Sequence, residues 1–215
     1  MKTTLYIVRH GESLGNARGI LLGHTDLDLS ELGYRQANAT AEYLAGTHID
    51  KIYSSDLLLA FNTAVPHAKL RGMKVIPDTE LREIHLGEWE GLHGEEIVER
   101  WPGSFSPEWH KNYGTFTYPG GENNYNVGFR IMAELERICR ENEGKTILIA
   151  THAAAIRAFW AIITGISPEQ MGEAVQFPSN ASYTVVEYVK NEFVPVEYSH
   201  DEQLADVGIT KIKLE

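Results

Sequence analysis

The sequence predicts an α/β fold: a three-layer sandwich with a mostly parallel central sheet, helices on both faces, and an inserted cap segment over the carboxyl edge of the strands. Short apolar runs typical of buried strands alternate along the 215 residues with longer segments that carry apolar residues at helical spacing. The alternation breaks between about residues 81 and 125, where aromatic residues, glycines and prolines gather. We therefore expect a single domain over residues 1–215 with a cap insertion over about 81–125.

The strands are predicted from short apolar runs, at residues 5–8, 52–54, 74–76 and 146–150. The last of these runs, TILIA, is apolar throughout, as expected for a strand buried on both faces in the centre of a parallel sheet. Two further runs, 183–189 and 193–198, are separated by Lys190-Asn191-Glu192 and predict a hairpin near the end of the chain.

The helices are predicted from capping residues followed by apolar residues at helical spacing: from Ser30 to Leu44, from Asp56 to Leu70, from Asn123 or Asn124 onward, and from about Ala153 onward. Gly46 lies near the expected end of the first helix. Pro66 falls inside the second helix, which would tolerate it only with a kink or a break.

Composition and charge exclude several classes of partner. Hydrophobic residues make up 43% and charged residues 23% of the chain, which is ordinary for a globular protein with a real core. The formal net charge is −11 and there is no basic run, so we expect no nucleic acid partner. A pocket on an acidic protein can still be locally positive, so a small phosphorylated ligand is compatible with this charge.

Cysteine usage and hydropathy limit the cellular setting. Cys139 is the only cysteine, which leaves no internal disulfide and no cysteine metal cluster. No apolar run is long enough to span a bilayer, so we expect no membrane contact. The first residues carry one lysine and then enter the first predicted strand, which is not the pattern of a cleavable signal. We expect a cytoplasmic protein.

The most informative motif is Arg9-His10-Gly11-Glu12, which directly follows the apolar run at residues 5–8. A strand that ends there releases an arginine and a histidine at the carboxyl edge of the sheet, where open α/β sheets bind their ligands. The guanidinium of Arg9 can donate a fork of hydrogen bonds to a phosphate, and a ring nitrogen of His10 can act as a nucleophile.

A second histidine, His152, follows the TILIA strand, and a helix is expected to begin immediately behind it. The free N–H groups at that helix start, near Ala153, would point at an anion beside His152. Two parallel strands would thus bring two histidines to one sheet edge, which favours a phosphate pocket. A structural role for both histidines is the plainer alternative. A metal site built from the two histidines and a glutamate is disfavoured because Arg9 would repel a cation.

Further segments complete an ordered set of motifs between Leu5 and about Arg157: RHGES with Asn16, GHTDLDLSELGYRQA, YSSDL, LRE with GEWEG, PGGE and THAAAIR. In this order they resemble the histidine phosphatase superfamily, the phosphoglycerate-mutase-like fold. The resemblance covers roughly seven-tenths of the chain. Each motif is weak alone, and the ordered set is specific.

The resemblance implies a nucleophile, His10, that takes the phosphoryl group and forms a phosphohistidine. Glu83 would be the general acid that protonates the leaving oxygen and then the base that activates water. The residues that would bind the substrate or its phosphate are Arg9, Asn16, Gly23, His152 and Ala153, the last through its N–H. No metal and no other cofactor is then expected, because arginine and histidine replace the cations used elsewhere in phosphoryl transfer.

The chain departs from the family pattern at Leu59, where the family usually has an arginine that reaches the phosphoryl group. Loss of one such donor costs on the order of 10²–10³-fold in rate. Either Arg18, Arg82 or Arg130 replaces that arginine, or the protein is a slow or degenerate member. Ala153-Ala154 also stands in place of the usual Gly-Gly, and this change keeps the N–H donor if φ is negative there.

The sequence therefore predicts a phosphatase that acts on a small phosphorylated metabolite. One alternative is a phospho-ligand-binding protein that lost its chemistry together with the arginine at Leu59. The other is a phosphoglycerate-type mutase, which is disfavoured because the cap lacks the Arg-Arg pair that binds a substrate carboxylate in those relatives. The aromatic residues of the cap hint at a partly apolar substrate.

Several other residues near the motifs have weaker assignments. His24 and His85 lie close enough to the motifs to touch substrate, whereas the remaining histidines are expected in surface or loop positions. Glu88 and Glu90 are read as solvated or structural carboxylates rather than as the catalytic acid. The C-terminal hairpin could form a homodimer interface or a sheet edge.

Overall fold

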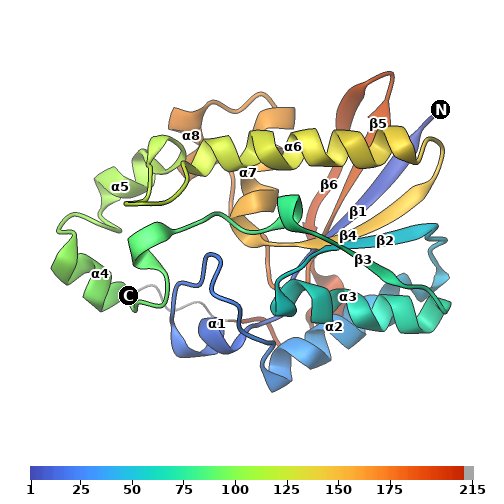
Figure 1. Cartoon of the computed structure of the whole chain (residues 1–215), viewed down its shortest axis with the longest axis horizontal. Coiled ribbons are helices and arrows are strands. Elements are labelled where there is room, and N and C mark those ends of the chain that lie inside the picture. The colour runs from blue at the N-terminus through green and yellow to red at the C-terminus, as the bar shows by residue number, and fades with distance from the viewer. Residues whose placement is uncertain (211–215) are drawn as a thin grey trace.

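A six-stranded sheet runs through the computed structural model, which describes residues 1–210 (Figure 1). Its strand order is β3-β2-β4-β1-β5-β6. The bounds are β1 Thr3–Arg9, β2 Lys51–Ser55, β3 Val75–Asp78, β4 Thr146–Thr151, β5 Tyr183–Val189 and β6 Glu192–His200. The first four strands in this order are parallel, whereas β5 is antiparallel to β1 and pairs with β6 as a hairpin. The predicted mostly parallel sheet and C-terminal hairpin are confirmed.

The helices of the described residues are α1 Leu14–Arg18, α2 Glu31–Tyr43, α3 Leu58–Arg71, α4 Gly94–Arg100, α5 Pro107–Lys111, α6 Asn124–Glu141, α7 Ala153–Ile163 and α8 Pro168–Ala174. Two predicted caps are confirmed: the side chain of Ser30 accepts a hydrogen bond from the N–H of Gly33, and that of Asn123 accepts from Tyr125 and Asn126. None of these helices is long and apolar enough to cross a membrane.

The second predicted helix was wrong in its start. It begins at Leu58 rather than at Asp56, because the carboxylate of Asp56 binds the guanidinium of Arg82 and Leu57 keeps an extended backbone. Of the two outcomes predicted at Pro66, a break is absent: the helix continues through this residue to Arg71, although a proline removes one hydrogen bond from the helix interior. Tertiary contacts around α3 therefore override the local signals.

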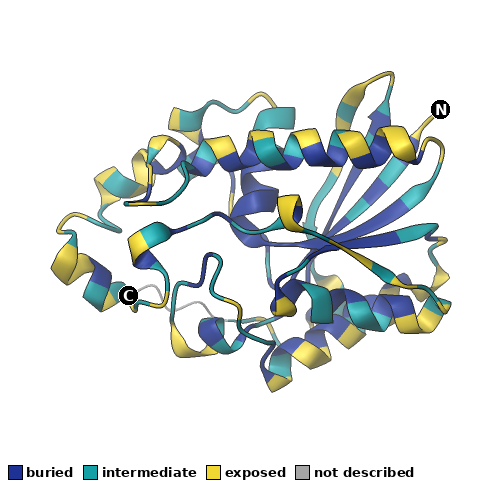
Figure 2. Cartoon of the chain, in the orientation of Figure 1, coloured by how far each residue is buried: buried dark blue, intermediate teal, exposed yellow. Residues whose placement is uncertain are grey.

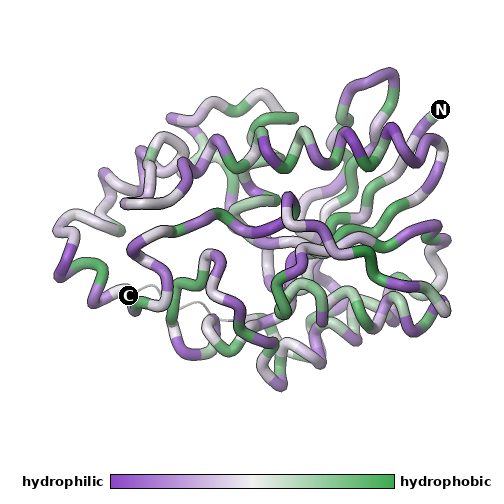
Figure 3. Tube along the Cα trace, viewed as in Figure 1, coloured by the Kyte–Doolittle hydropathy of each residue, from purple (hydrophilic) through white to green (hydrophobic). Residues whose placement is uncertain are grey.

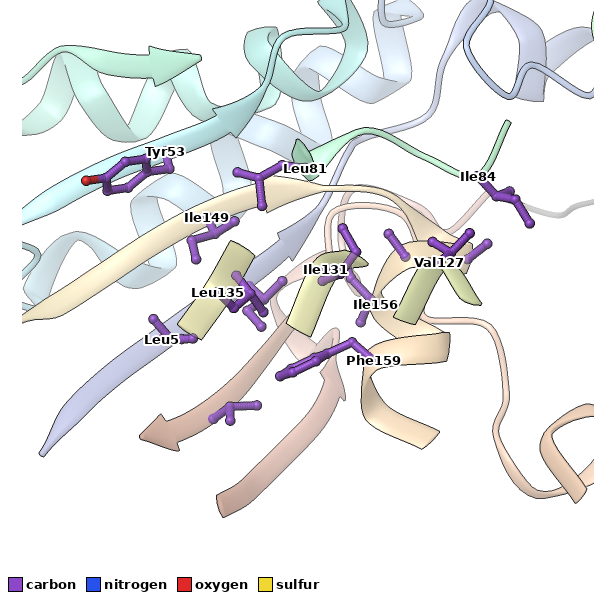
Figure 4. Close-up of a cluster of buried hydrophobic side chains, with 14 of the residues drawn as sticks. Leu5, Tyr53, Leu81, Ile84, Val127, Ile131, Leu135, Ile149, Ile156 and Phe159 are labelled. Carbon is purple, nitrogen blue, oxygen red and sulfur yellow. The ribbon is translucent and has the colours of Figure 1, made fainter. Parts of the chain in front are cut away.

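The core lies on both faces of the sheet because successive strand residues point to opposite sides. On one face, Leu5 and Ile149 pack against α6 and α7; Figure 4 shows Leu135 of α6 beside Ile149 and Leu5, and Ile131 and Val127 of α6 beside Ile156 of α7. On the other face, alternate residues of the same strands, such as Leu148, pack against α3. Figure 2 shows the strands largely buried, and Figure 3 shows hydrophobic residues along them. The predicted three layers are confirmed.

The segment between β3 and α6 leaves the sheet and carries α4 and α5 out beyond it (Figure 1). Its centre is Trp89, which is fully buried and whose ring lies 5.1–6.2 Å from five other aromatic rings, those of Trp101, Phe105, Trp109, Phe116 and Tyr118. These rings join the cap to the main core, because Trp89 and Tyr118 belong to the same buried cluster as Leu5 and Ile131. The last five residues of the domain predicted over 1–215 lie outside the described residues.

Candidate active site

His10 and His152 leave neighbouring strands at the same level. Strands β1 and β4 are paired in parallel, with Arg9 opposite Thr151, so the next residue of each strand is a histidine. Both side chains are buried, and their ring centroids lie 5.3 Å apart. The predicted convergence of two histidines at the carboxyl edge of the sheet is therefore present.

The ring of His10 is held in one tautomer by the backbone. Its Nδ1 atom lies 2.7 Å from the carbonyl oxygen of Gly11. A carbonyl oxygen can only accept, so Nδ1 carries the proton and Nε2 keeps a free lone pair. Burial, followed by the charge of Arg9, lowers the pKa of His10 to about 3. At neutral pH the ring is uncharged and Nε2 can attack an electrophile.

His152 contacts a residue that the sequence analysis did not single out. Its Nε2 atom lies 2.8 Å from Oγ of Ser55, the last residue of β2. Burial holds the pKa of His152 well below its usual value, and the neighbouring basic groups His10, His24, Arg130 and Arg9 act in the same direction. A negatively charged ligand would oppose these effects and favour the protonated ring.

Arg9 is a buried cation with an unsatisfied donor. Its Nη1 donates to the carbonyl oxygen of Pro178 at 2.5 Å, whereas its buried Nε has no hydrogen-bond partner among residues 1–210. Burial lowers the pKa of Arg9 to about 10, and the charge of Glu83 acts in the opposite direction. An anion in the site would supply both an acceptor and a counter-charge.

Asn16 presents its amide nitrogen to the site. Its Oδ1 accepts hydrogen bonds from the N–H of Ser13 at 3.2 Å and from Nδ2 of Asn180 at 3.3 Å. Within residues 1–210, this leaves Nδ2 of Asn16 as a donor without a partner. Asn180 also donates to the carbonyl oxygen of His10 at 3.1 Å, so it ties the two predicted residues together. No sequence signal marked Asn180, which precedes β5 far along the chain.

Glu83 occupies the N-terminus of α7. Its carboxylate accepts hydrogen bonds from the N–H groups of Ile84, Ala154 and Ala155 at 3.0, 3.2 and 3.1 Å. Burial raises the pKa of Glu83, and these bonds together with the charge of Arg9 offset the rise only in part. Two of the helix N–H groups expected to face the phosphate thus bind Glu83 instead. Ala153 begins α7 and does not have a positive φ, so an alanine fits where the family usually has glycine, and its N–H remains available as a donor.

A cavity of about 1240 Å³ lies beside these groups. All seven predicted site residues line it, namely Arg9, His10, Asn16, Gly23, Glu83, His152 and Ala153. The cap contributes the opposite wall, which was not predicted in detail: His93, Glu95, Val98, Glu99, Phe105, Trp109, His110, Tyr113 and Tyr118. The sequence-predicted site residues are therefore gathered around one space between the sheet edge and the cap.

The contacts of His24, His85 and Glu90 bear on three weaker assignments. His24 and His85 do not line the cavity, so the expectation that they touch substrate finds no support; Nε2 of His24 donates to the carbonyl oxygen of Glu83 at 2.8 Å. Oε1 of Glu90 accepts from the N–H groups of His24 and Leu86, both at 3.0 Å, which is a structural role as predicted.

Leu59 is buried at the position of the missing arginine and lines the cavity. Of the three candidate replacements, Arg82 binds Asp56, and Arg130 binds Glu122 and backbone carbonyls. Only Arg18 lines the cavity. Among residues 1–210, no group of three or more His, Cys, Asp or Glu side chains is placed to hold a metal ion.

A family model described as the histidine phosphatase superfamily (branch 1) matches residues 5–201. The metal-independent phosphoserine phosphatase of Arabidopsis thaliana is 33% identical over 208 residues, which cover 96% of this chain and 85% of that protein. The glucosyl-3-phosphoglycerate phosphatase of Mycobacterium tuberculosis is 35% identical over 188 residues, covering 84% and 83%. The solved structure of Bacillus stearothermophilus YhfR superposes with a TM-score of 0.87 at 28% identity, over 94% of this chain and 99% of that one.

Proposed function

Because the chain belongs to branch 1 of the histidine phosphatase superfamily and is a phosphoric monoester hydrolase, we propose that it hydrolyses a small phosphorylated metabolite through a phosphohistidine on His10. The observation that carries the proposal is the 2.7 Å contact between Nδ1 of His10 and the carbonyl oxygen of Gly11. It leaves an uncharged Nε2 lone pair beside a buried arginine, which is the arrangement a nucleophile for a phosphoryl group needs.

The first half of the reaction forms the phosphohistidine. Nε2 of His10 attacks the phosphorus atom, and the bond between phosphorus and the leaving oxygen breaks. The carboxylic acid of Glu83 gives its proton to that oxygen, so the product leaves as a neutral alcohol. A raised pKa for Glu83 suits this role because it keeps the proton on the carboxyl group at higher pH.

The second half returns the enzyme to its starting state. The carboxylate of Glu83 takes a proton from a water molecule, the water oxygen attacks phosphorus, and the bond from phosphorus to Nε2 breaks. Phosphate then leaves, and His10 is again uncharged. Negative charge on the phosphoryl oxygens is stabilised by the guanidinium of Arg9, the Nδ2 group of Asn16, the N–H of Ala153 and the ring of His152. We expect no step to need a metal ion.

The names of the relatives suggest the size and kind of substrate. Phosphoserine and glucosyl-3-phosphoglycerate, which appear in them, are small phosphorylated metabolites. A transfer to a second substrate position, as in a mutase, is disfavoured because no arginine or lysine of the cap lines the cavity within the described residues. The cap wall combines aromatic side chains with Glu95 and Glu99, which favours an apolar alcohol over a carboxylate-bearing one.

Hydrolysis of 4-nitrophenyl phosphate in the presence of EDTA tests the proposal. We expect activity in the wild type and in His48→Ala, whose side chain is exposed, and none above background in His10→Ala. Quenching the wild type during turnover with an alkaline denaturant should trap phosphate on the protein in a form that is stable to alkali and is released by acid. Activity that survives in His10→Ala, or that EDTA abolishes, would overturn the proposed mechanism.

A further inference from the structure

The backbone that leads into Glu83 is bound by the side chain of Arg130, which comes from α6. The guanidinium donates hydrogen bonds to the carbonyl oxygens of Glu80, Arg82 and Glu83, at 2.7, 3.0 and 3.0 Å. One side chain therefore fixes three of the four carbonyl groups in this irregular segment. The five N–H donors of the guanidinium bind these three carbonyls and the carboxylate of Glu122 at once, whereas the ammonium group of a lysine has only three donors.

The remaining contacts of the segment complete its fixation. Thr151, the residue before His152, donates from Oγ1 to the carbonyl oxygen of Leu81 at 2.6 Å. Arg82 binds Asp56 through two parallel hydrogen bonds of 2.7 and 2.5 Å. Every backbone carbonyl from residue 80 to residue 83 thus accepts a hydrogen bond from a side chain. The donors are Arg130 of α6, Thr151 at the end of β4 and, at the carbonyl of Glu83, also His24.

Glu122 orients Arg130 and belongs to the PGGE motif, which otherwise has no assigned purpose. Its two carboxylate oxygens each accept from Arg130 at 3.1 Å. Oε2 of Glu122 also accepts from the N–H of His85, and the N–H of Glu122 donates to the carbonyl oxygen of His85, both at 2.8 Å. A side chain at Gly121 would collide with that carbonyl. The PGGE turn is therefore packed directly against the chain that follows Glu83.

We propose that Arg130, held by Glu122, is a positioning residue for the reaction: it places the carboxyl group of Glu83 at the leaving oxygen of the substrate. This inference rests on the roles proposed above for His10 and Glu83. Neither Arg130 nor Glu122 lines the cavity, so we assign both an effect on the reaction through Glu83 and not through contact with the substrate. A general acid must come within about 2.6–3.2 Å of the atom that it protonates, and a misplacement of about 1 Å can cost on the order of 10²-fold in rate.

Leaving-group dependence distinguishes positioning of the acid from a merely structural role. Benzyl phosphate releases an alkoxide that needs a proton, whereas 4-nitrophenyl phosphate releases a phenolate that is stable without one. We therefore expect Arg130→Met to lower kcat/KM by about 10²-fold for benzyl phosphate and by no more than about 3-fold for 4-nitrophenyl phosphate. The ratio of kcat/KM for benzyl phosphate to kcat/KM for 4-nitrophenyl phosphate measures this selectivity. In Arg130→Lys this ratio should lie between those of the wild type and Arg130→Met, and Glu122→Gln should show the same selective loss as Arg130→Met.

Arg140 supplies a matched control on the same helix. Its guanidinium pairs with Glu136 at 2.6 Å, and its side chain is 61% exposed. Arg140→Met should leave kcat/KM for both substrates within about 2-fold of the wild type, as expected for a surface ion pair. Thermal unfolding should show that each variant is folded, and Arg130→Lys decides the question if Arg130→Met does not fold.

The Glu83→Gln variant separates failure of this inference from failure of the proposed function. Suppose that Glu83→Gln selectively lowers kcat/KM for benzyl phosphate, whereas Arg130→Met lowers kcat/KM for both substrates equally. Arg130 then has no positioning role, and Glu83 remains the proposed acid. If Glu83→Gln itself shows no selectivity, the proposed acid is wrong and the positioning role falls with it. Selective loss in Glu83→Gln, Arg130→Met and Glu122→Gln together supports the inference.

Discussion

The rings of His10 and His152 lie 5.3 Å apart, and burial lowers the pKa of both. Arg9 is then the one fixed cation among the groups proposed to bind the phosphoryl oxygens, which carry close to two negative charges at neutral pH. A bound dianion next to His152 raises the pKa of that ring and favours its protonation. The empty and the occupied site should therefore differ by a proton.

We predict that phosphate binding at about pH 8, where free phosphate is a dianion, takes up close to one proton per site. Isothermal titration calorimetry in buffers with different ionisation enthalpies measures this number directly. Leu59→Arg should reduce the uptake, because a second fixed cation removes the need for a protonated ring. An undiminished uptake in His152→Gln would show that the proton goes to another group.

A second prediction concerns the missing arginine itself. Leu59 lines the cavity with its side chain buried, so Leu59→Arg would bring a guanidinium toward the phosphoryl site. We expect kcat/KM for 4-nitrophenyl phosphate to rise by about 10-fold or more. One such donor contributes on the order of 10²–10³-fold in rate, and the rearrangement of neighbouring side chains around the larger arginine reduces this gain. Leu59→Met, which changes shape without adding charge, should remain near the wild type. If Leu59→Arg is no faster than Leu59→Met, the present site, with Arg18 on its wall, already compensates for the arginine that is missing at position 59.

A third prediction follows from the burial of Glu83, which raises its pKa. The acid must hold its proton to protonate the leaving oxygen, so kcat/KM for benzyl phosphate should fall as pH rises through that raised pKa. His10, with a pKa of about 3, should add no loss of activity above about pH 4. The pH profile of Glu83→Gln should lack the alkaline fall and keep only the titration of the substrate. An alkaline fall of the same size in that variant would assign it to another group.

Much of this site could be predicted because it follows from the ends of two parallel strands. Apolar runs at residues 5–8 and 146–150 identify neighbouring buried strands, and the residues after them must share one edge of the sheet. The family motifs then add Glu83 and Asn16, and both line the same cavity as His10. Local sequence was sufficient wherever chain direction and side-chain alternation set the geometry.

The rest depended on contacts between residues far apart in the chain. The start of α7 binds Glu83, and that pairing spans 71 residues to Ala154. Asp56 has the chemistry of a helix cap, yet it is used as the partner of Arg82, so α3 begins later than predicted. Asn180 lies beside Asn16 only because β5 pairs with β1. No periodicity or spacing along the sequence encodes such pairings.

The last prediction concerns stability and tests a buried histidine outside the site. The expectation of a surface or loop position was wrong for His67, which lies in α3 and is fully buried, because α3 packs that side chain inward. Neither of its ring nitrogens has a hydrogen-bond partner within residues 1–210. Burial, followed by the charge of Arg71, lowers the pKa of His67 from 6.5 to about 3. Below about pH 6.5, the His67 ring therefore binds a proton in the unfolded chain but stays unprotonated in the folded protein. The contribution of His67 to stability is fully present above pH 6.5 and is lost as the pH falls toward 3.

Replacing His67 with leucine, which has a similar size and no proton to bind, should remove this loss. Urea unfolding at about pH 4.5 should show that His67→Leu stabilises the folded state by about 3 kcal/mol relative to its effect at pH 7.5, because each unit of pKa difference corresponds to about 1.36 kcal/mol. His48→Leu is the control: that side chain is 82% exposed, and its replacement should leave the pH dependence of the unfolding free energy close to that of the wild type. Equal pH dependence in His67→Leu and the wild type would mean that His67 is protonated inside the fold, which would require a partner for its ring nitrogens.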